Sequence, residues 1–153
     1  MKTVIKNAIS KLTEYLNNNQ CWKGRENEIV NLFAHDMLFS EINEKGPLYH
    51  IGQIGIEVSV QQINSNKKNL VRKDLIIWPV KNMTVWQNDD NEYNVPLAII
   101  EWKTKKIIDC EYDKEWLMKY TKDKITIGYS IFIDINTKYI KFWEIENGKE
   151  NTV

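Results

Sequence analysis

The runs Asp74-Leu75-Ile76-Ile77-Trp78-Pro79 and Pro96-Leu97-Ala98-Ile99-Ile100-Glu101-Trp102-Lys103 decide the fold that we predict for this chain. Each run is short, apolar, and rich in β-branched and aromatic residues, which is typical of a buried strand. The residues between them, 81–94, include the polar turn formers of 88–92. We therefore expect the two strands to pair as an antiparallel hairpin with a long connection.

The pairing of this hairpin predicts a cluster of charge. The start of the first strand lies beside the end of the second, which places Asp74 next to Glu101. Side chains alternate along a strand, so Glu101 and Lys103 share one face and Trp102 occupies the other. Two carboxylates and an ammonium then meet at the edge of an apolar sheet, where unpaired charge is costly. A bound divalent cation would offset that cost.

Hydrophobic periodicity predicts the elements around the hairpin. Helices are expected from Lys2 to Asn18 and from about Arg25 to Leu38, followed by a half-buried strand from Ile54 to Gln62. After the hairpin we expect a helix from about Asp113 to Lys122, whose alternating charges are typical of a solvent-exposed face. The remaining predicted elements are two strands, Ile127 to Asp134 and Tyr139 to Ile145.

Composition indicates one domain, 1–153, with an accessory N-terminal helix (1–20), a core (24–145) and a frayed tail (147–153). The 21 basic and 21 acidic residues balance, so a polyanion would have to be met by local patches. Cys21 and Cys110 lack metal-ligand spacing and indicate a reducing compartment. With no membrane-spanning segment or signal peptide in the sequence, a cytoplasmic protein is the expectation.

The order of elements and the charged positions resemble the PD-(D/E)xK nuclease superfamily. Its signature is an acid that opens the second core strand and E-x-K at the end of the third, here Asp74 and Glu101-Trp102-Lys103. Lys73 stands where the family usually has proline. Arg25-Glu26-Asn27-Glu28-Ile29-Val30 resembles the E-R-E-L-(I/V) helix opening of archaeal Holliday-junction resolvases. The Q-x-x-x-Y motif of the RecB-like branch is incomplete, because Trp116 stands in place of its glutamine.

The resemblance implies a restriction-endonuclease-like α/β fold, in which helices flank a mixed sheet that contains an antiparallel three-strand meander. It also implies Mg²⁺ or Mn²⁺ held by Asp74, Glu101, the Trp102 backbone carbonyl and Glu26. Lys103 would position or deprotonate the attacking water. Glu28 is the reserve for Glu26, and the alternative for Glu26 is an acid that the helix dipole favours without any role in metal binding.

Basic residues near the predicted site offer contacts to a nucleic-acid backbone, although such runs are often simply solvated. They are Lys67, Lys68, Arg72, Lys73, Lys105 and Lys106. The expected activity is metal-dependent cleavage of phosphodiester bonds, most directly in DNA. Enzymes of this family often form dimers, and the first helix (Val4 to Leu16) is the predicted interface.

Other interpretations remain open. Asp74 and Glu101 would be ordinary strand-end charges if they are solvated or paired with Lys73 and Lys103. The chain would then fit a non-catalytic nucleic-acid-binding or assembly module that keeps the nuclease fold. An RNA-directed enzyme and a small antitoxin-like interaction protein are further alternatives.

Overall fold

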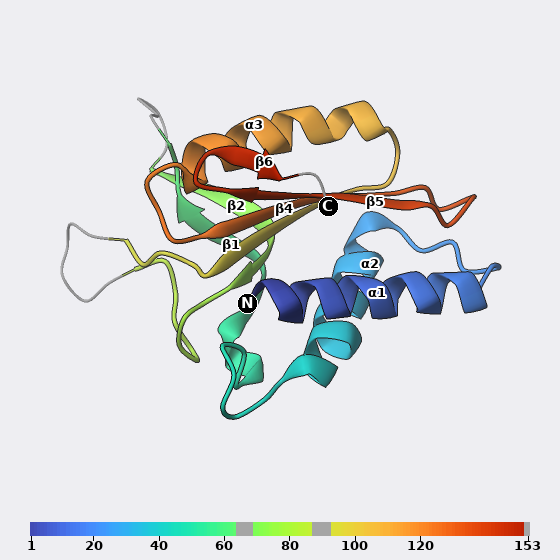
Figure 1. Cartoon of the computed structure of the whole chain (residues 1–153), viewed down its shortest axis with the longest axis horizontal. Helices are drawn as coiled ribbons and strands as arrows, with labels where there is room; N and C mark the ends of the chain where they lie inside the picture. The colour runs from blue at the N-terminus through green and yellow to red at the C-terminus, as the bar shows by residue number, and fades with distance from the viewer. Residues whose placement is uncertain (64–68, 87–92, 152–153) are drawn as a thin grey trace.

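The computed structural model describes residues 1–63, 69–86 and 93–151, and in it the chain adopts an α/β fold. Six strands form one mixed sheet with helices on both faces (Figure 1). The strands in sheet order are β1 Ile54–Gln61, β2 Leu70–Ile77, β3 Ala98–Lys103, β4 Ile127–Ile133, β5 Ile140–Glu146 and β6 Lys149–Asn151. The α-helices are α1 Lys2–Asn18, α2 Glu26–Leu32 and α3 Cys110–Thr121.

Shorter helical segments complete the structure. The helix predicted to run to Leu38 does so, but its second half is the π-helical segment η1 Phe33–Leu38. Three 3₁₀ segments follow along the chain, η2 Phe39–Glu41, η3 Ile51–Gln53 and η4 Ile107–Asp109. The last of these leads directly into α3.

The first three strands form the predicted antiparallel meander, and β2 pairs with β3 through Leu75 opposite Ile100. The next strand, β4, lies parallel to β3. A parallel pair needs a crossover rather than a tight hairpin, and α3 provides it. The remaining strands, β5 and β6, add on in antiparallel fashion.

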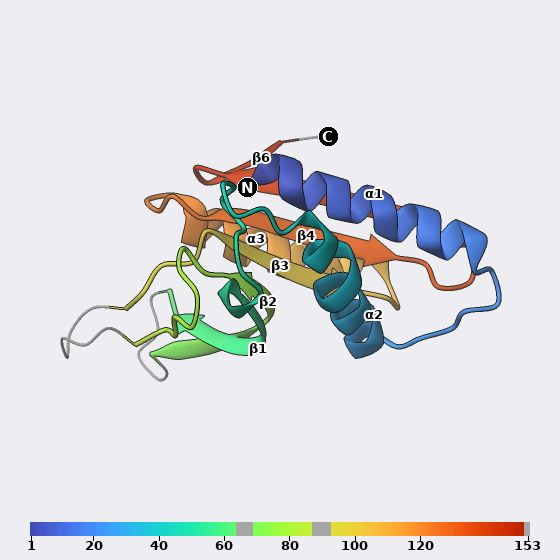
Figure 2. The same ribbon diagram turned by 90° about the horizontal axis from the view of Figure 1, so that it is seen from below.

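Helices α1 and α2 cover one face of the sheet and α3 covers the other (Figures 1 and 2). The buried residues of α1 recur at helical spacing and join the larger hydrophobic core. They are Ile5, Ala8, Ile9, Leu12 and Leu16. The apolar face of the helix that we predicted as a dimer interface is therefore buried within the chain.

Two further expectations were wrong. The tail does not fray directly after Asn147, because β6 pairs with β5, with Ile145 opposite Glu150. The charged residues of α3 are not all solvent-exposed either, since Asp113 and Lys114 are buried. Both are paired with other side chains, and Lys114 bonds to Glu150 of β6 at 3.2 Å. Pairing of this kind is what allows charged groups to be buried.

Candidate active site

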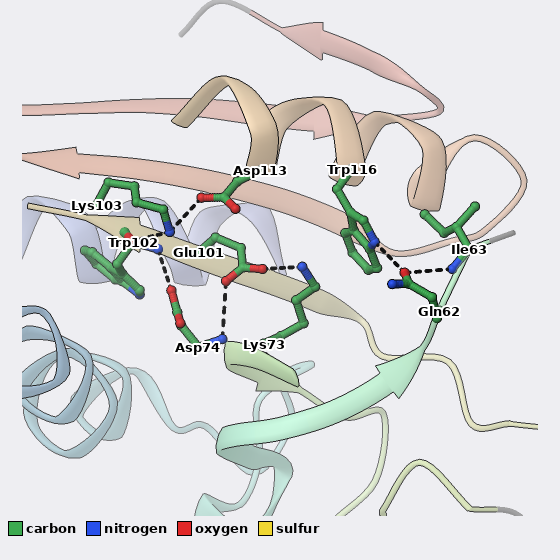
Figure 3. Close-up of polar contacts among 9 residues, drawn as sticks. All are labelled: Gln62, Ile63, Lys73, Asp74, Glu101, Trp102, Lys103, Asp113 and Trp116. Carbon is green, nitrogen blue, oxygen red and sulfur yellow. Dashed lines mark hydrogen bonds and ion pairs between the residues drawn. The ribbon is translucent and has the colours of Figure 1, made fainter. Parts of the chain in front are cut away.

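The candidate site forms where β2 and β3 separate. The last paired residues of the β2–β3 ladder at this end are Leu75 and Ile100. Beyond them, side chains bridge the strands: the Trp102 N–H donates to Asp74 Oδ2 at 2.8 Å, and the Asp74 N–H to Glu101 Oε2 at 3.4 Å (Figure 3). The strand pairing inferred from the two apolar runs therefore brings Asp74 and Glu101 together at one edge.

Glu101 is buried against a cation. Its Oε1 accepts a hydrogen bond from Lys73 Nζ, and the two residues are 5% and 4% exposed. The same ammonium lies 3.6 Å from the centroid of the Trp116 ring of α3 (Figure 3). Burial raises the pKa of Glu101 to about 8, although the charge of Lys73 opposes that rise.

The placement of Lys73 corrects its prediction as a nucleic-acid contact. Its amino group is enclosed by Glu101 and Trp116 and does not reach the surface. The alternative of a strand-end acid paired with a neighbouring lysine holds for Lys73 and Glu101. It does not hold for Lys103, whose ammonium pairs with Asp113.

Lys103 is fixed between β3 and α3. Its Nζ lies 2.8 Å from Asp113 Oδ2 and donates to the Trp102 carbonyl at 2.9 Å (Figure 3). Burial lowers the pKa of Lys103, but the hydrogen bond to Asp113 and the surrounding negative charges outweigh this effect and raise it to about 12. At neutral pH the side chain is thus a cation that can donate but cannot accept a proton.

A cavity of about 700 Å³ opens beside these residues. Glu26, Asp74 and Lys103 all line it. Burial raises the pKa of Glu26, and the nearby Asp74 carboxylate adds to that rise while the charge of Lys103 opposes it. Glu28 instead accepts a hydrogen bond from the Arg25 N–H at 2.6 Å and caps α2. Of the two candidate helix acids, Glu26 is the one at the cavity.

Glu57 is a cavity residue that the sequence did not reveal. It lines the cavity and adopts a left-handed backbone conformation with φ 55°. In the β1–β2 pairing, Ile56 is opposite Leu75 and Val58 is opposite Lys73, but Glu57 is not paired with Asp74. The sequence signal for this break is Gly55 in the same strand, where an added Cβ would lie 2.7 Å from Val58 Cγ2, because an isolated glycine in a strand indicates a bulge. Asp113 was also missed, because its charge was assigned to a solvated helix face.

The remaining predicted nucleic-acid contacts fall into two groups. Lys67 and Lys68 lie outside the described residues. Arg72, Lys105 and Lys106 are exposed, and Lys105 lines the cavity. Arg72 also lies 3.4 Å from Glu57. Among the described residues of the predicted set, Lys105 is therefore the one that lines the cavity.

The charges at this edge bear on whether a cation fits. Four carboxylates and two lysines act on one another electrostatically, so the cluster carries an excess of negative charge when all are ionised. They are Glu26, Asp74, Glu101, Asp113, Lys73 and Lys103. Among the described residues, however, no three His, Cys, Asp or Glu side chains are grouped so that they could hold a metal ion. An ion such as Mg²⁺ keeps several waters and can be held by one or two carboxylates, and the residues here that could supply them are Asp74 and Glu101.

No protein-family model, curated protein or solved structure matches this chain. Within the part of the chain that the structure describes, no helix has both the length and the apolar character needed to cross a bilayer.

Proposed function

We propose that this chain is a divalent-metal-dependent nuclease with a restriction-endonuclease-like core. The observation that carries the proposal is the meeting of Asp74, Glu101 and Lys103 where β2 and β3 separate, beside a cavity. The antiparallel meander, the crossover helix and the parallel fourth strand are also what the resemblance to PD-(D/E)xK nucleases implies.

Asp74 and Glu101 would hold the ion, with Glu26 at the cavity wall. Glu101 would exchange its contact with Lys73 for the ion, and the Trp102 carbonyl would exchange its contact with Lys103. The bound ion would supply Lewis-acid polarisation of a phosphodiester oxygen and an acidified water. A bound ion would explain why carboxylates that repel one another gather at a buried edge of the sheet.

Lys103 would act as a hydrogen-bond donor to a phosphate oxygen as negative charge develops on it. Because its neighbours hold the side chain in the charged form, Lys103 would not deprotonate the attacking water. The exposed Lys105 would contact the substrate backbone from the loop after β3. DNA is the proposed substrate on the strength of the resemblance alone.

The charge of the cavity makes its own contribution to this proposal. Its lining includes the cations of Arg25, Lys103 and Lys105, and the acids are one more in number. They are Glu26, Glu57, Asp74 and Asp109. A phosphodiester would therefore enter a cavity without net positive charge, and a divalent cation would remove that barrier.

The test is metal-dependent cleavage of plasmid, linear, single-stranded and branched DNA. Lys103→Ala should lower the rate by orders of magnitude and leave affinity nearly unchanged, because its bond is made in the transition state. Lys105→Ala, the matched loss of one ammonium, should weaken binding in a salt-dependent way and leave the rate at saturation intact. Identical behaviour of the two variants would contradict the role of Lys103.

A second candidate function is a non-catalytic nucleic-acid-binding module with the same fold. It is favoured by the buried Lys73–Glu101 pair, which already satisfies one of the two carboxylates. In that case the wild-type protein would bind DNA without any metal-dependent cleavage. Lys103→Ala would then cost only about one phosphate contact in salt-sensitive affinity.

A further inference from the structure

The ammonium of Lys103 is held from two sides. Asp113 of α3 bonds to it at 2.8 Å and the Trp102 carbonyl of β3 accepts from it at 2.9 Å (Figure 3). A lysine ammonium has three N–H donors. These two contacts within the described structure leave one donor for a group in the cavity that Lys103 lines.

Asp113 is built into this position rather than lying on the surface. The residue is only 6% exposed and sits in the first turn of α3, where the helix dipole favours a carboxylate. Among the described residues, Asp113 forms its ion pair with Lys103. Exposed pairs hold long side chains poorly, whereas a desolvated carboxylate on a packed helix provides a fixed anchor.

The neighbours of Lys103 show what this anchor prevents. The carboxylates of Asp74 and Glu101 also attract the ammonium electrostatically. A lysine stem has four flexible carbons. Without Asp113, the ammonium would be drawn toward these two carboxylates and would neutralise the charge that a divalent cation needs.

We propose that Asp113 is a positioning residue, which holds the Lys103 ammonium at the cavity and keeps it away from the Asp74 carboxylate. The role assigned to Lys103 in cleavage rests on the proposed function, whereas the contact itself does not. The two parts are therefore tested by separate measurements.

The rate measurement compares wild type, Asp113→Asn, Lys103→Ala and the double variant in single-turnover cleavage. Asp113→Asn should slow cleavage by about 100-fold without raising KM, the cost typical of misplacing a reacting group. In the Lys103→Ala background the same substitution should cause no further loss, because Asp113 acts through Lys103. The control is Glu111→Gln, which removes a carboxylate from the same turn of α3. The Glu111 side chain is 54% exposed and pairs with Lys114. The cleavage rate of this variant should match that of wild type.

The second measurement is the melting temperature of the same four proteins without metal or DNA. If Asp113 holds Lys103, the losses in melting temperature of the single variants should not add in the double variant. Additive losses, or an equal slowing of cleavage by Asp113→Asn with and without the Lys103 amino group, would overturn the proposal. A wild type that cleaves nothing would refute the nuclease, and the melting temperatures alone would then decide whether Asp113 positions Lys103.

Discussion

The free energy of unfolding that is lost on removing one member of the buried Lys73–Glu101 pair should depend on which member is removed. Glu101→Gln leaves an ammonium buried beside Trp116, in a residue only 4% exposed. Burial raises the pKa of Glu101 to about 8, so at pH 7 its carboxyl group is mostly protonated, and the neutral amide should replace it at a cost of about 1 kcal/mol.

The reverse substitution, Lys73→Met, should cost more, because it removes the hydrogen bond that the ammonium donates to Glu101 and its contact with the Trp116 ring. The loss is limited because the carboxyl group that remains can stay protonated at pH 7. Methionine also keeps apolar contact with the Trp116 ring. We expect a loss of about 2–3 kcal/mol in the free energy of unfolding, and the double variant Lys73→Met/Glu101→Gln should lose less than the two single losses combined.

The assay is urea denaturation at pH 7 followed by circular dichroism, with m-values compared to confirm that the transition stays two-state. In a chain of this size the Lys73→Met loss corresponds to a fall in Tm on the order of 5–10 °C. Equal losses in the two single variants, together with an additive double variant, would refute the reasoning. That result would mean that Lys73 and Glu101 do not interact in the folded protein.

Three further predictions concern ionisation, metal and backbone. The native state holds the Glu101 proton more tightly than the unfolded chain, in which the reference pKa of this group is 4.5. The metal-free protein should therefore lose stability as the pH rises from about 4.5 to about 8. Thermal melts across that range should show a melting temperature that depends less on pH in Glu101→Gln than in wild type. Mg²⁺ or Mn²⁺ should raise the melting temperature of the wild type by mass action, and an equal rise in Asp74→Asn would place the ion elsewhere. Glu57→Asn should raise the free energy of unfolding by about 1 kcal/mol, because Asn tolerates the left-handed backbone at φ 55°. Ser59→Asn, in the same strand, should lower it, and a loss at both positions would show that the Glu57 backbone is unstrained.

The strands and their pairing were predictable because they depend on local apolar runs. β-Branched runs bounded by turn residues identified β2 and β3, and their antiparallel pairing then placed Asp74 beside Glu101. The resemblance of residues 25–30 to a resolvase helix opening pointed to Glu26, which lines the cavity. What these features share is that each is encoded within a few consecutive residues.

The parts that could not be predicted depend on contacts between distant elements. Lys73 belongs to a basic stretch in the sequence, and only the packing of α3 against the sheet encloses its amino group beneath Trp116. Asp113 carries no signal that distinguishes it from the solvated acids of its helix. The short strand β6 is polar throughout, so its pairing with β5 leaves no hydrophobic pattern.

The position of α1 has a consequence for synthesis on the ribosome. This helix is synthesised long before β5, yet it is joined to that strand by Lys2, whose Nζ bonds to Glu146 at 2.6 Å. Its buried face also shares a core with Ile131 and Ile133 of β4. An amphipathic helix alone is only marginally stable in water. During translation, β4 can therefore cover the apolar face of α1 only after more than a hundred further residues have been added.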